Sequence, residues 1–292
     1  MAELMRYTVS SEYDGVKAGR YLRTVCKLSA RTLSMLKRTE GALTVDGKLL
    51  RTIDILKEGS VVIIRLPDEE NSIEPIKGDL NVLYEDNWLL LVNKPSNMPV
   101  HPVKNHQTDT LANIIAYKYR DIKSEFVFRA VNRLDSDTTG IVIIAKDRHT
   151  ASVMQNTEVE KRYMAVCHGV VAESGTIDSP IRLADNSKIV RVVADDGQKA
   201  VTHYKNIKTF SEGSLVELIL ETGRTHQIRC HMSSIGHPLF GDDLYGGRLD
   251  KITRQALHCY SVKFVHPFTN AQIRVECDLH ADMNNLIEEL NI

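Results

Sequence analysis

The chain has 292 residues, of which 42% are hydrophobic and 26% are charged, and its formal net charge is −1. This composition is typical of a globular protein with one large domain or two unequal ones, and it contains no apolar run long enough to span a membrane. The five cysteines are scattered and form no Cys-x-x-Cys pair, so we expect neither a structural zinc site nor a disulfide framework. Reduced thiols and an N-terminus without signal-peptide character predict a cytoplasmic protein.

Charge is distributed unevenly along the chain. Residues 1–66 hold 12 Lys and Arg against 7 Asp and Glu, whereas residues 67–80 hold 1 against 5. This change predicts two modules: a small basic α+β domain at 1–66, which we call the head, and a larger domain at 81–292, which we call the body, joined by an acidic linker at 67–80. The body is nearly neutral, which still allows a local basic groove for nucleic acid.

Two short helices are predicted in the head. Basic residues at helical spacing place the first helix at about 20–27, and Ser29 is the predicted N-cap of a second helix that should end at Gly41. Their basic faces suit a grip on RNA phosphates, and the alternative is an ordinary solvated surface. The basic residues on the two predicted helices are Arg20, Arg23, Lys27, Arg31, Lys37 and Arg38.

A hairpin and a strand complete the predicted head. Asp46-Gly47 between two apolar runs is a strong signal for a tight hairpin turn, and residues 60–66 have the composition of a strand. This arrangement resembles the S-four-like RNA-binding module, named for a small-subunit ribosomal protein, and the resemblance implies RNA binding. The chain departs from that module at Ala30, where a basic residue usually follows the capping serine.

The body is predicted to combine strands and helices without a regular alternation. Tight turns at Asp196-Gly197 and Glu212-Gly213 indicate hairpins. The predicted fold class is therefore α+β, a mixed, mainly antiparallel sheet with flanking helices, rather than a parallel α/β wind. The expected elements are two strands within 82–95, a helix at 110–119, a buried strand at 141–146, a helix at 148–159 and a strand at 163–169.

A polar loop precedes the buried strand at 141–146. In it Asp135 follows Arg133 closely and stands before a cluster of turn-forming residues. Loops held by a rigid sheet often carry chemistry, which makes Asp135 a candidate catalytic residue. The alternative is that Asp135 and Asp137 only form turns, because aspartate readily bonds its own backbone.

A second polar segment runs from Thr222 to Met232. Thr225 is the predicted cap of a helix that should end at Gly236, with His226 and Arg229 on one face. Arg229 lies in the first turn, where the helix dipole disfavours a cation, so we expect a fixed anionic partner, with Asp135 as the candidate. A structural ion pair without catalysis is the alternative. The predicted buried stripe of this helix is Ile228, Met232 and Ile235.

A third segment opens a strand with two cations and a tyrosine. Lys161 and Arg162 suit contacts with phosphates, and the ring of Tyr163 suits stacking on a base or acid–base chemistry. Simple packing of the ring in the strand is the alternative.

Together these segments resemble the pseudouridine synthases of the RluA-like family, which act on large-subunit ribosomal RNA and some transfer RNAs. The likeness covers about residues 80–280 in the family's order. The departures are Asn132 for a usual histidine, Thr139 for a usual serine and Asn97 for a common glycine. The motifs that carry the likeness are Arg133-Leu134-Asp135 with Thr138-Thr139-Gly140, Lys161-Arg162-Tyr163, the unbroken run from Thr222 to Arg229, Asn93-Lys94-Pro95, Gly241-Asp242 and Leu257-His258.

The resemblance implies how the site works. Asp135 is expected to be essential, Tyr163 to line the uracil pocket, and Arg229 to pair with the aspartate. Uracil is detached from ribose, rotated and rejoined through carbon, which requires no metal or nucleotide cofactor. Attack by Asp135 on the anomeric carbon and removal of a sugar proton both remain open. The target base must leave its stack, and Arg133 is expected to fill the vacated space. The other RNA contacts expected in the body are Lys161, Arg162, Arg224 and His226.

Other functions fit the sequence less well. His226 and His231 lie five residues apart, and His226 is followed by Gln227 rather than glutamate, so no metal site is predicted. There is also no Gly-x-Ser-x-Gly motif and no Gly-rich phosphate loop. The remaining alternative is a non-catalytic RNA-binding or ribosome-assembly factor on the same scaffold. We expect an RNA partner, with ribosomal RNA favoured over transfer RNA, no membrane partner and a monomer.

Overall fold

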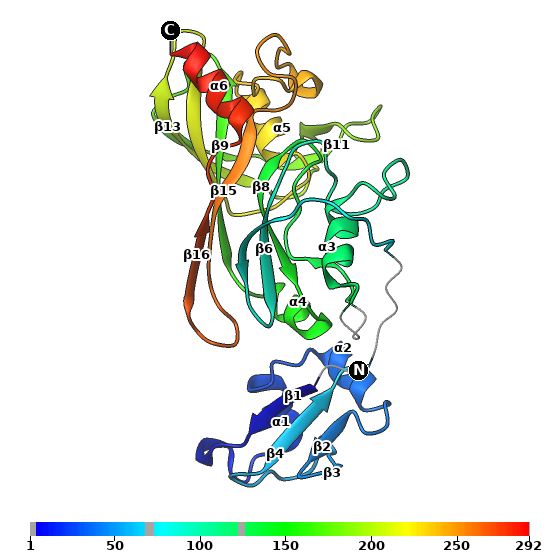
Figure 1. Ribbon diagram of the computed structural model, residues 1–292. Helices are drawn as coiled ribbons and strands as arrows, with labels where there is room; N and C mark the ends of the chain where they lie inside the picture. Colours follow the sequence, from blue (N-terminus) through cyan, green and yellow to red (C-terminus); the bar gives the residue numbers. More distant parts are fainter. Residues whose placement is uncertain (1–3, 68–72, 122–125, 292) are drawn as a thin grey trace.

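The computed structural model describes residues 4–67, 73–121 and 126–291 and shows a small head below a larger body (Figure 1). Part of the predicted linker, residues 68–72, lies outside the described residues. Each of the two parts has its own cluster of buried hydrophobic side chains. One gathers side chains from Val9 to Leu66, and the other gathers side chains from Leu89 to Phe264. Within the described ranges, every helix is too short or too polar to cross a bilayer.

The head is a four-stranded antiparallel sheet with two helices. The strand order is β1 (Leu4–Thr8), β4 (Val61–Arg65), β2 (Leu43–Val45) and β3 (Lys48–Leu49), with a short 3₁₀ turn at Ser11–Tyr13. The Asp46-Gly47 turn joins β2 to β3 with positive φ at both residues, which confirms the predicted hairpin. Strand β1 was not predicted.

Both head helices are shorter than the sequence predicts. Helix α1 (Ala18–Thr24) ends before Lys27, whose φ is 52°, and the Leu28 amide donates back to the Leu22 carbonyl, so Lys27 does not share the face of Arg20 and Arg23. A basic residue in this left-handed position gives no sequence signal for a helix end.

The Ser29 cap is confirmed, because its side chain accepts from the Thr32 amide at the start of α2 (Ala30–Leu36). The helix ends at Leu36, however, with Lys37 as its C-cap. Arg38 and Gly41 therefore lie in the turn that follows the helix, so the predicted end at Gly41 is wrong.

The body is built on a ten-stranded mixed sheet that is antiparallel except between β8 and β15, which confirms the predicted fold class. Strand β16 pairs with β15, β7 pairs with β8, and β11 (Ile181–Leu183) with β12 (Arg191–Val193) forms a separate ribbon. The strands in sheet order are β10 (Ser174–Asp178), β13 (Val201–Thr209), β14 (Gly213–Leu220), β9 (Val159–His168), β15 (Leu257–Val265), β8 (Thr139–Ala145), β6 (Leu89–Lys94) and β5 (Asn81–Glu85), with β7 at Arg129–Ala130 and β16 at Gln272–Glu276.

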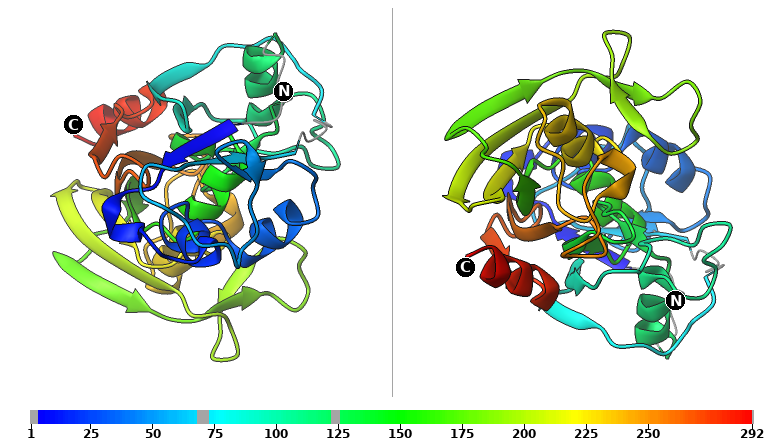
Figure 2. Two further views of the ribbon diagram at one scale, coloured as in Figure 1. Left: turned by 90° about the horizontal axis from the view of Figure 1, so that it is seen from below. Right: turned by 90° about the horizontal axis from the view of Figure 1, so that it is seen from above.

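In the described part of the body, four helices and a 3₁₀ turn accompany this sheet: α3 (Leu111–Tyr119), α4 (Arg148–Met154), α5 (Gln227–Ser234), α6 (Ala281–Leu290) and η2 (Asp243–Tyr245). The head faces the end of the body that carries α4 and the β15–β16 turn, and the views along the long axis show it lying across this end (Figure 2). Among the described residues, side-chain contacts between the parts include the bond from Lys27 Nζ to the Pro267 carbonyl at 2.5 Å and the approach of Arg148 Nη1 to Met35 Sδ at 3.0 Å.

Several predicted boundaries in the body need correction. Helix α4 ends at Met154 rather than 159, and β9 begins at Val159, ahead of Tyr163. The Glu212-Gly213 turn does join β13 and β14, whereas Asp196-Gly197 follows β12, which pairs with β11 and not with β13.

Helix α5 also differs from its prediction. Its N-cap position is His226 in a left-handed conformation, φ 57°, rather than Thr225, and it ends at Ser234. Ile228 and Met232 are buried as expected, but the side chain at position 235 lies past the helix end, and Ile235 is 38% exposed.

The pairing of β8 with β15 fixes the position of the loop that carries Asp135. Gly140 has φ 112°, and a Cβ at this position would lie 2.2 Å from the Cys259 carbonyl oxygen. Only glycine allows this conformation and this approach. All seven residues of β8 are buried, so the loop before it is attached to a strand in the core of the sheet.

Candidate active site

Asp135 lies in the loop between β7 and β8, and its carboxylate meets side chains from α5. Arg229 Nη1 donates to Asp135 Oδ2 at 3.2 Å, and His226 Nε2 lies 3.7 Å from the same oxygen. The side chain of Asp135 is 28% exposed, whereas that of Arg229 is 8% exposed. The structure therefore brings the predicted aspartate and arginine together, with the cation behind a carboxylate that remains open to a ligand.

Arg229 has a second partner that the sequence analysis did not identify. Its Nε and Nη2 donate to the two carboxylate oxygens of Asp242, each at 2.7 Å, and Asp242 is 1% exposed. Burial opposes the charge on Arg229, but the bonds that it donates to Asp242 and the charge of Asp135 outweigh burial and raise the pKa of the guanidinium. Asp242 fixes the plane of the guanidinium, which leaves Nη1 free to meet Asp135.

His226 contacts both the carboxylate and Tyr245. Its Nδ1 lies 3.0 Å from Tyr245 Oη, and the Arg229 guanidinium lies 5.1 Å from the centre of the Tyr245 ring. Burial is the largest influence on His226 and lowers the pKa of its imidazole, so the ring is neutral near pH 7. The direct counter-charge to Asp135 is therefore Arg229. Tyr245 was not predicted, and nothing in its local sequence marks it.

Tyr163 lies on β9 and is 6% exposed. Together with Asp135 it lines a cleft. Burial raises the pKa of its phenol well above the usual value. Tyr163 thus stays protonated near pH 7 and cannot act there as a general base. Its geometry favours a role as a neutral ring in the wall of the cleft.

The cleft in front of Asp135 has a volume of about 700 Å³, within the usual range for small-ligand pockets. Arg133 and Arg224 are exposed at its edge. Lys161 also lines it, and burial lowers the pKa of this lysine. Arg191 of β12 adds a cation that the sequence analysis did not predict. These positive charges surround an opening suited to a phosphate-bearing ligand.

Arg162 does not belong to this cleft. Successive side chains of a strand point to opposite faces, so Lys161 and Tyr163 face the cleft and Arg162 faces away. Its guanidinium instead pairs with Glu160 at 2.7 Å and Glu217 at 3.5 Å. The prediction of Arg162 as an RNA contact beside Tyr163 is not supported by this placement.

The three departures from the family pattern have structural explanations. The Asn132 side chain donates to the Ile141 carbonyl and accepts from the Ile143 amide, so it ties the loop to β8. Asn97 has φ 54°, a conformation that glycine adopts freely and asparagine tolerates. Thr139 Oγ1 lies 2.7 Å from His258 Nδ1.

Lys94 contacts the backbone of the loop that carries Asp135, and the sequence analysis assigned it no role. It is fully buried, and its ammonium donates to the carbonyls of Pro95, Met98 and Ser136 at 2.8, 2.9 and 2.7 Å. Burial lowers the pKa of Lys94 to about 7. Its three bonds join the end of β6 to the residue that follows Asp135.

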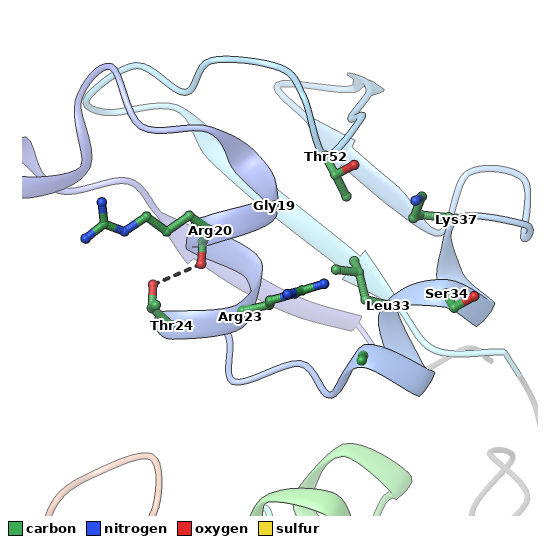
Figure 3. A pocket seen from close by; sticks show the side chains of 9 residues that line it. Gly19, Arg20, Arg23, Thr24, Leu33, Ser34, Lys37 and Thr52 are labelled. Carbon is green, nitrogen blue, oxygen red and sulfur yellow. Dashed lines mark hydrogen bonds between the residues drawn. The ribbon is translucent and has the colours of Figure 1, made fainter.

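The basic residues of the head separate into two groups. Arg20, Arg23 and Lys37 line a groove of about 490 Å³ between α1 and α2, and Arg23 extends into the space between the helices (Figure 3). Lys27 instead reaches Pro267 of the body. Arg31 and Arg38 are exposed but do not line this groove.

The histidines of α5 are engaged in protein contacts. His231 lies 2.8 Å from Thr202 Oγ1 and 2.9 Å from the Ser179 carbonyl. In the part of the chain that the structure describes, no group of three or more metal-ligating side chains is close enough to hold an ion.

The known proteins that this chain resembles in sequence and in structure are pseudouridine synthases. Residues 88–234 match the family described as RNA pseudouridylate synthase. An uncharacterised RNA pseudouridine synthase of Bacillus subtilis is 40% identical over 273 residues, which cover 90% of this chain and 96% of that protein. A ribosomal large subunit pseudouridine synthase D of Pseudomonas aeruginosa is 38% identical over 263 residues, covering 83% of this chain and 82% of that one. The solved structure of human RNA pseudouridylate synthase domain containing 4 has a TM-score of 0.59 at 27% identity and covers 72% of this chain and 92% of that one.

Proposed function

This chain belongs to the RNA pseudouridylate synthase family, and we propose that Asp135 is the residue on which its isomerisation of uridine to pseudouridine depends. The resemblance drawn from the sequence is thereby confirmed, and the alternative of a non-catalytic factor is not retained. The observation that carries the proposal is the contact of the accessible Asp135 carboxylate with the enclosed Arg229 guanidinium at 3.2 Å.

The reaction breaks the bond between C1′ and N1 of uridine and forms a bond between C1′ and C5. N1 takes up a proton and C5 loses one, so the change is an isomerisation. An ionised Asp135 serves this change at the sugar, either by attack on C1′ or by removal of a sugar proton. Arg229 places a positive charge against the Asp135 carboxylate, and its bonds to Asp242 fix the orientation of the guanidinium. Tyr163, as a neutral ring, packs against the everted base, and Arg133 fills the space that the base leaves.

The proposed substrate is large-subunit ribosomal RNA. The support is the name of the Pseudomonas aeruginosa relative, whose similarity covers 83% of this chain. Pseudouridines should be mapped across total RNA of cells with and without the gene. The proposal expects the loss of one or a few sites in large-subunit ribosomal RNA, whereas loss confined to transfer RNA would refute this substrate. A monomeric state and a cytoplasmic location are part of the same proposal, and the unpaired thiols support the location.

The head is proposed to be an S-four-like RNA-binding domain that holds phosphates in the groove between α1 and α2. Replacing Arg23 and Lys37 together with glutamine should lower RNA affinity and flatten the plot of log K against log salt by about 1.5, because each lost phosphate contact removes roughly 0.7 to 0.9 from the slope. Filter binding over a range of salt concentrations measures this change.

A matched control removes two head cations that lie outside the groove. Lys48→Gln with Lys57→Gln takes away the same charge from exposed positions. This pair should leave the slope nearly unchanged. Equal slopes for the groove variant, the control variant and the original protein would mean that the groove does not bind phosphate.

A further inference from the structure

Two buried cations hold the backbone of the two residues that follow Asp135. Lys94 donates to the Ser136 carbonyl at 2.7 Å, and Arg254 Nη1 donates to the Asp137 carbonyl at 2.9 Å. Arg254 is 7% exposed and comes from the segment before β15, far along the chain from the loop. The catalytic loop is therefore held by cations at consecutive carbonyls rather than by strand pairing alone.

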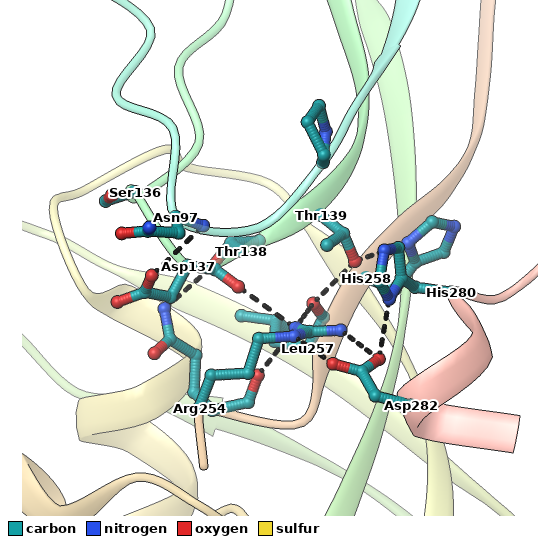
Figure 4. A network of polar contacts seen from close by, with 12 residues as sticks. Asn97, Ser136, Asp137, Thr138, Thr139, Arg254, Leu257, His258, His280 and Asp282 are labelled. Carbon is teal, nitrogen blue, oxygen red and sulfur yellow. Dashed lines mark hydrogen bonds and ion pairs between the residues drawn. The ribbon is translucent and has the colours of Figure 1, made fainter. Parts of the chain in front are cut away.

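Arg254 is itself fixed by the C-terminal helix. Its Nε and Nη2 donate to both carboxylate oxygens of Asp282 at 2.6 and 2.7 Å, as Figure 4 shows. A bidentate pair of this kind sets the plane of the guanidinium. The remaining nitrogen, Nη1, is then aimed at the carbonyls of Asp137, Gln255 and Leu257.

The surroundings of Asp282 favour its ionised form and fix its position. It stands in the first turn of α6, where the helix dipole favours an anion. Burial opposes its ionisation, but the bonds from Arg254 and His280 outweigh burial and lower the pKa of the Asp282 carboxyl. Its position is set by core packing, because Met283, Leu286 and Leu290 of α6 are buried in a cluster with Phe240 and other side chains of the body.

The same segment reaches the loop a second time. Gln255 Nε2 donates to Thr138 Oγ1 at 3.2 Å, so neighbouring residues 254 and 255 contact neighbouring residues 137 and 138. Together with the Lys94 bond, these contacts act on three successive residues after Asp135. A displacement of α6 would therefore be passed to the backbone that carries the carboxylate.

We propose that Arg254, oriented by Asp282 of α6, is a positioning residue for Asp135, and that the C-terminal helix thereby helps to set the rate of isomerisation. The proposal rests on the catalytic role proposed for Asp135. Both residues lie outside the segment 88–234 that matches the family. A loop of turn-forming residues has several accessible conformations, and a misplacement of about 1 Å of a reacting group can cost roughly 100-fold in rate.

The test compares Asp282→Asn with a control on the same helix. Asparagine keeps the size of the side chain but cannot accept two charge-assisted bonds from Arg254. The control is Glu289→Gln, which breaks the ion pair of Glu289 with Lys251 (2.6 Å) without touching the catalytic loop. The substrate is RNA labelled with 5-tritiated uridine, taken from cells that lack the gene, and the readouts are the single-turnover rate of tritium release and the Kd for this RNA.

Asp282→Asn should lower the rate of release about 10- to 100-fold and change the Kd less than about twofold. Asp282→Glu should recover part of the rate, because a carboxylate is restored, and Glu289→Gln should match the original protein. Thermal unfolding establishes that each variant is folded at the assay temperature. If Asp282→Asn does not fold, the double variant Arg254→Met with Asp282→Leu replaces it, since removing both charges avoids an unpaired buried ion.

The possible results separate the two proposals. A folded Asp282→Asn or double variant that releases tritium at the original rate overturns the positioning role, as does a change confined to Kd. A control Asp135→Asn protein that remains active would instead refute the role proposed for Asp135. Loss of activity in Asp135→Asn together with an unaffected Asp282→Asn would leave the proposed function standing and remove this inference alone.

Discussion

Asp135→Asn is expected to lower the rate of pseudouridine formation by roughly 10³- to 10⁴-fold, because an amide is a poor nucleophile and a poor base. The change conserves the size of the side chain, and its carbonyl oxygen can still accept from Arg229 Nη1. The structure of the site should therefore persist while the chemistry is lost. Tritium release from RNA labelled at C5 of uridine measures the rate directly, since formation of the bond to C5 expels that hydrogen.

RNA binding should survive the same substitution within about twofold. The cations around the cleft and in the head groove supply the attraction for phosphates, and none of them depends on the negative charge of Asp135. Removing a carboxylate from the path of a polyanion should, if anything, favour binding. In this variant we therefore expect a large loss of rate with almost no change in the Kd.

Asp137→Asn is the matched control for this experiment. Asp137 is in the same loop, and its Oδ1 accepts from the Asn97 amide at 3.2 Å, a bond that an asparagine oxygen can also accept. This variant should keep most of its activity. An Asp135→Asn protein with activity similar to Asp137→Asn would show that the chemistry does not depend on Asp135.

The parts of the site that the sequence predicted share a local cause. Arg229 lies in the first turn of α5, against the preference of the helix dipole, and that conflict indicated a fixed anion nearby. Asp135 stands before a fully buried strand, which indicated a rigid loop. Each signal could be found within about ten residues of chain, and the contact at 3.2 Å joins them.

The parts that the sequence did not predict depend on tertiary packing. Asp242 and Arg254 carry ordinary polar side chains in irregular segments, and nothing within either segment indicates its partner. Their burial, 1% and 7% exposed, is what makes their charges important, and burial is set by the assembled body. Strand β1 in the head was missed for the same reason. It forms by pairing with β4, which lies at the other end of the head in the sequence.

Asp242→Asn is expected to reduce the free energy of unfolding by about 3 kcal/mol or more, the lower end of the cost of breaking a buried ion pair from one side. The side chain of Asp242 is fully buried, so no water can replace the lost charge, and Arg229 is left in the core with one of its two carboxylates. Urea unfolding at neutral pH measures the change. The control is Asp196→Asn, which removes a carboxylate that meets Arg182 at 2.8 Å with a 74% exposed side chain, and it should cost less than about 1 kcal/mol.

The same variant should also slow the reaction at least about 10-fold in the protein that remains folded. Two carboxylates share the charge of Arg229 in the original protein, and Asp242 takes two bonds of 2.7 Å while Asp135 takes a single bond of 3.2 Å. Without the charge of Asp242, the guanidinium is free to turn toward Asp135 and bind it more tightly. A carboxylate bound more strongly by a cation is a weaker nucleophile and a weaker base. Unchanged stability together with an unchanged rate would mean that Arg229 is held in place by packing, and that Asp242 has no part in setting the reactivity of Asp135.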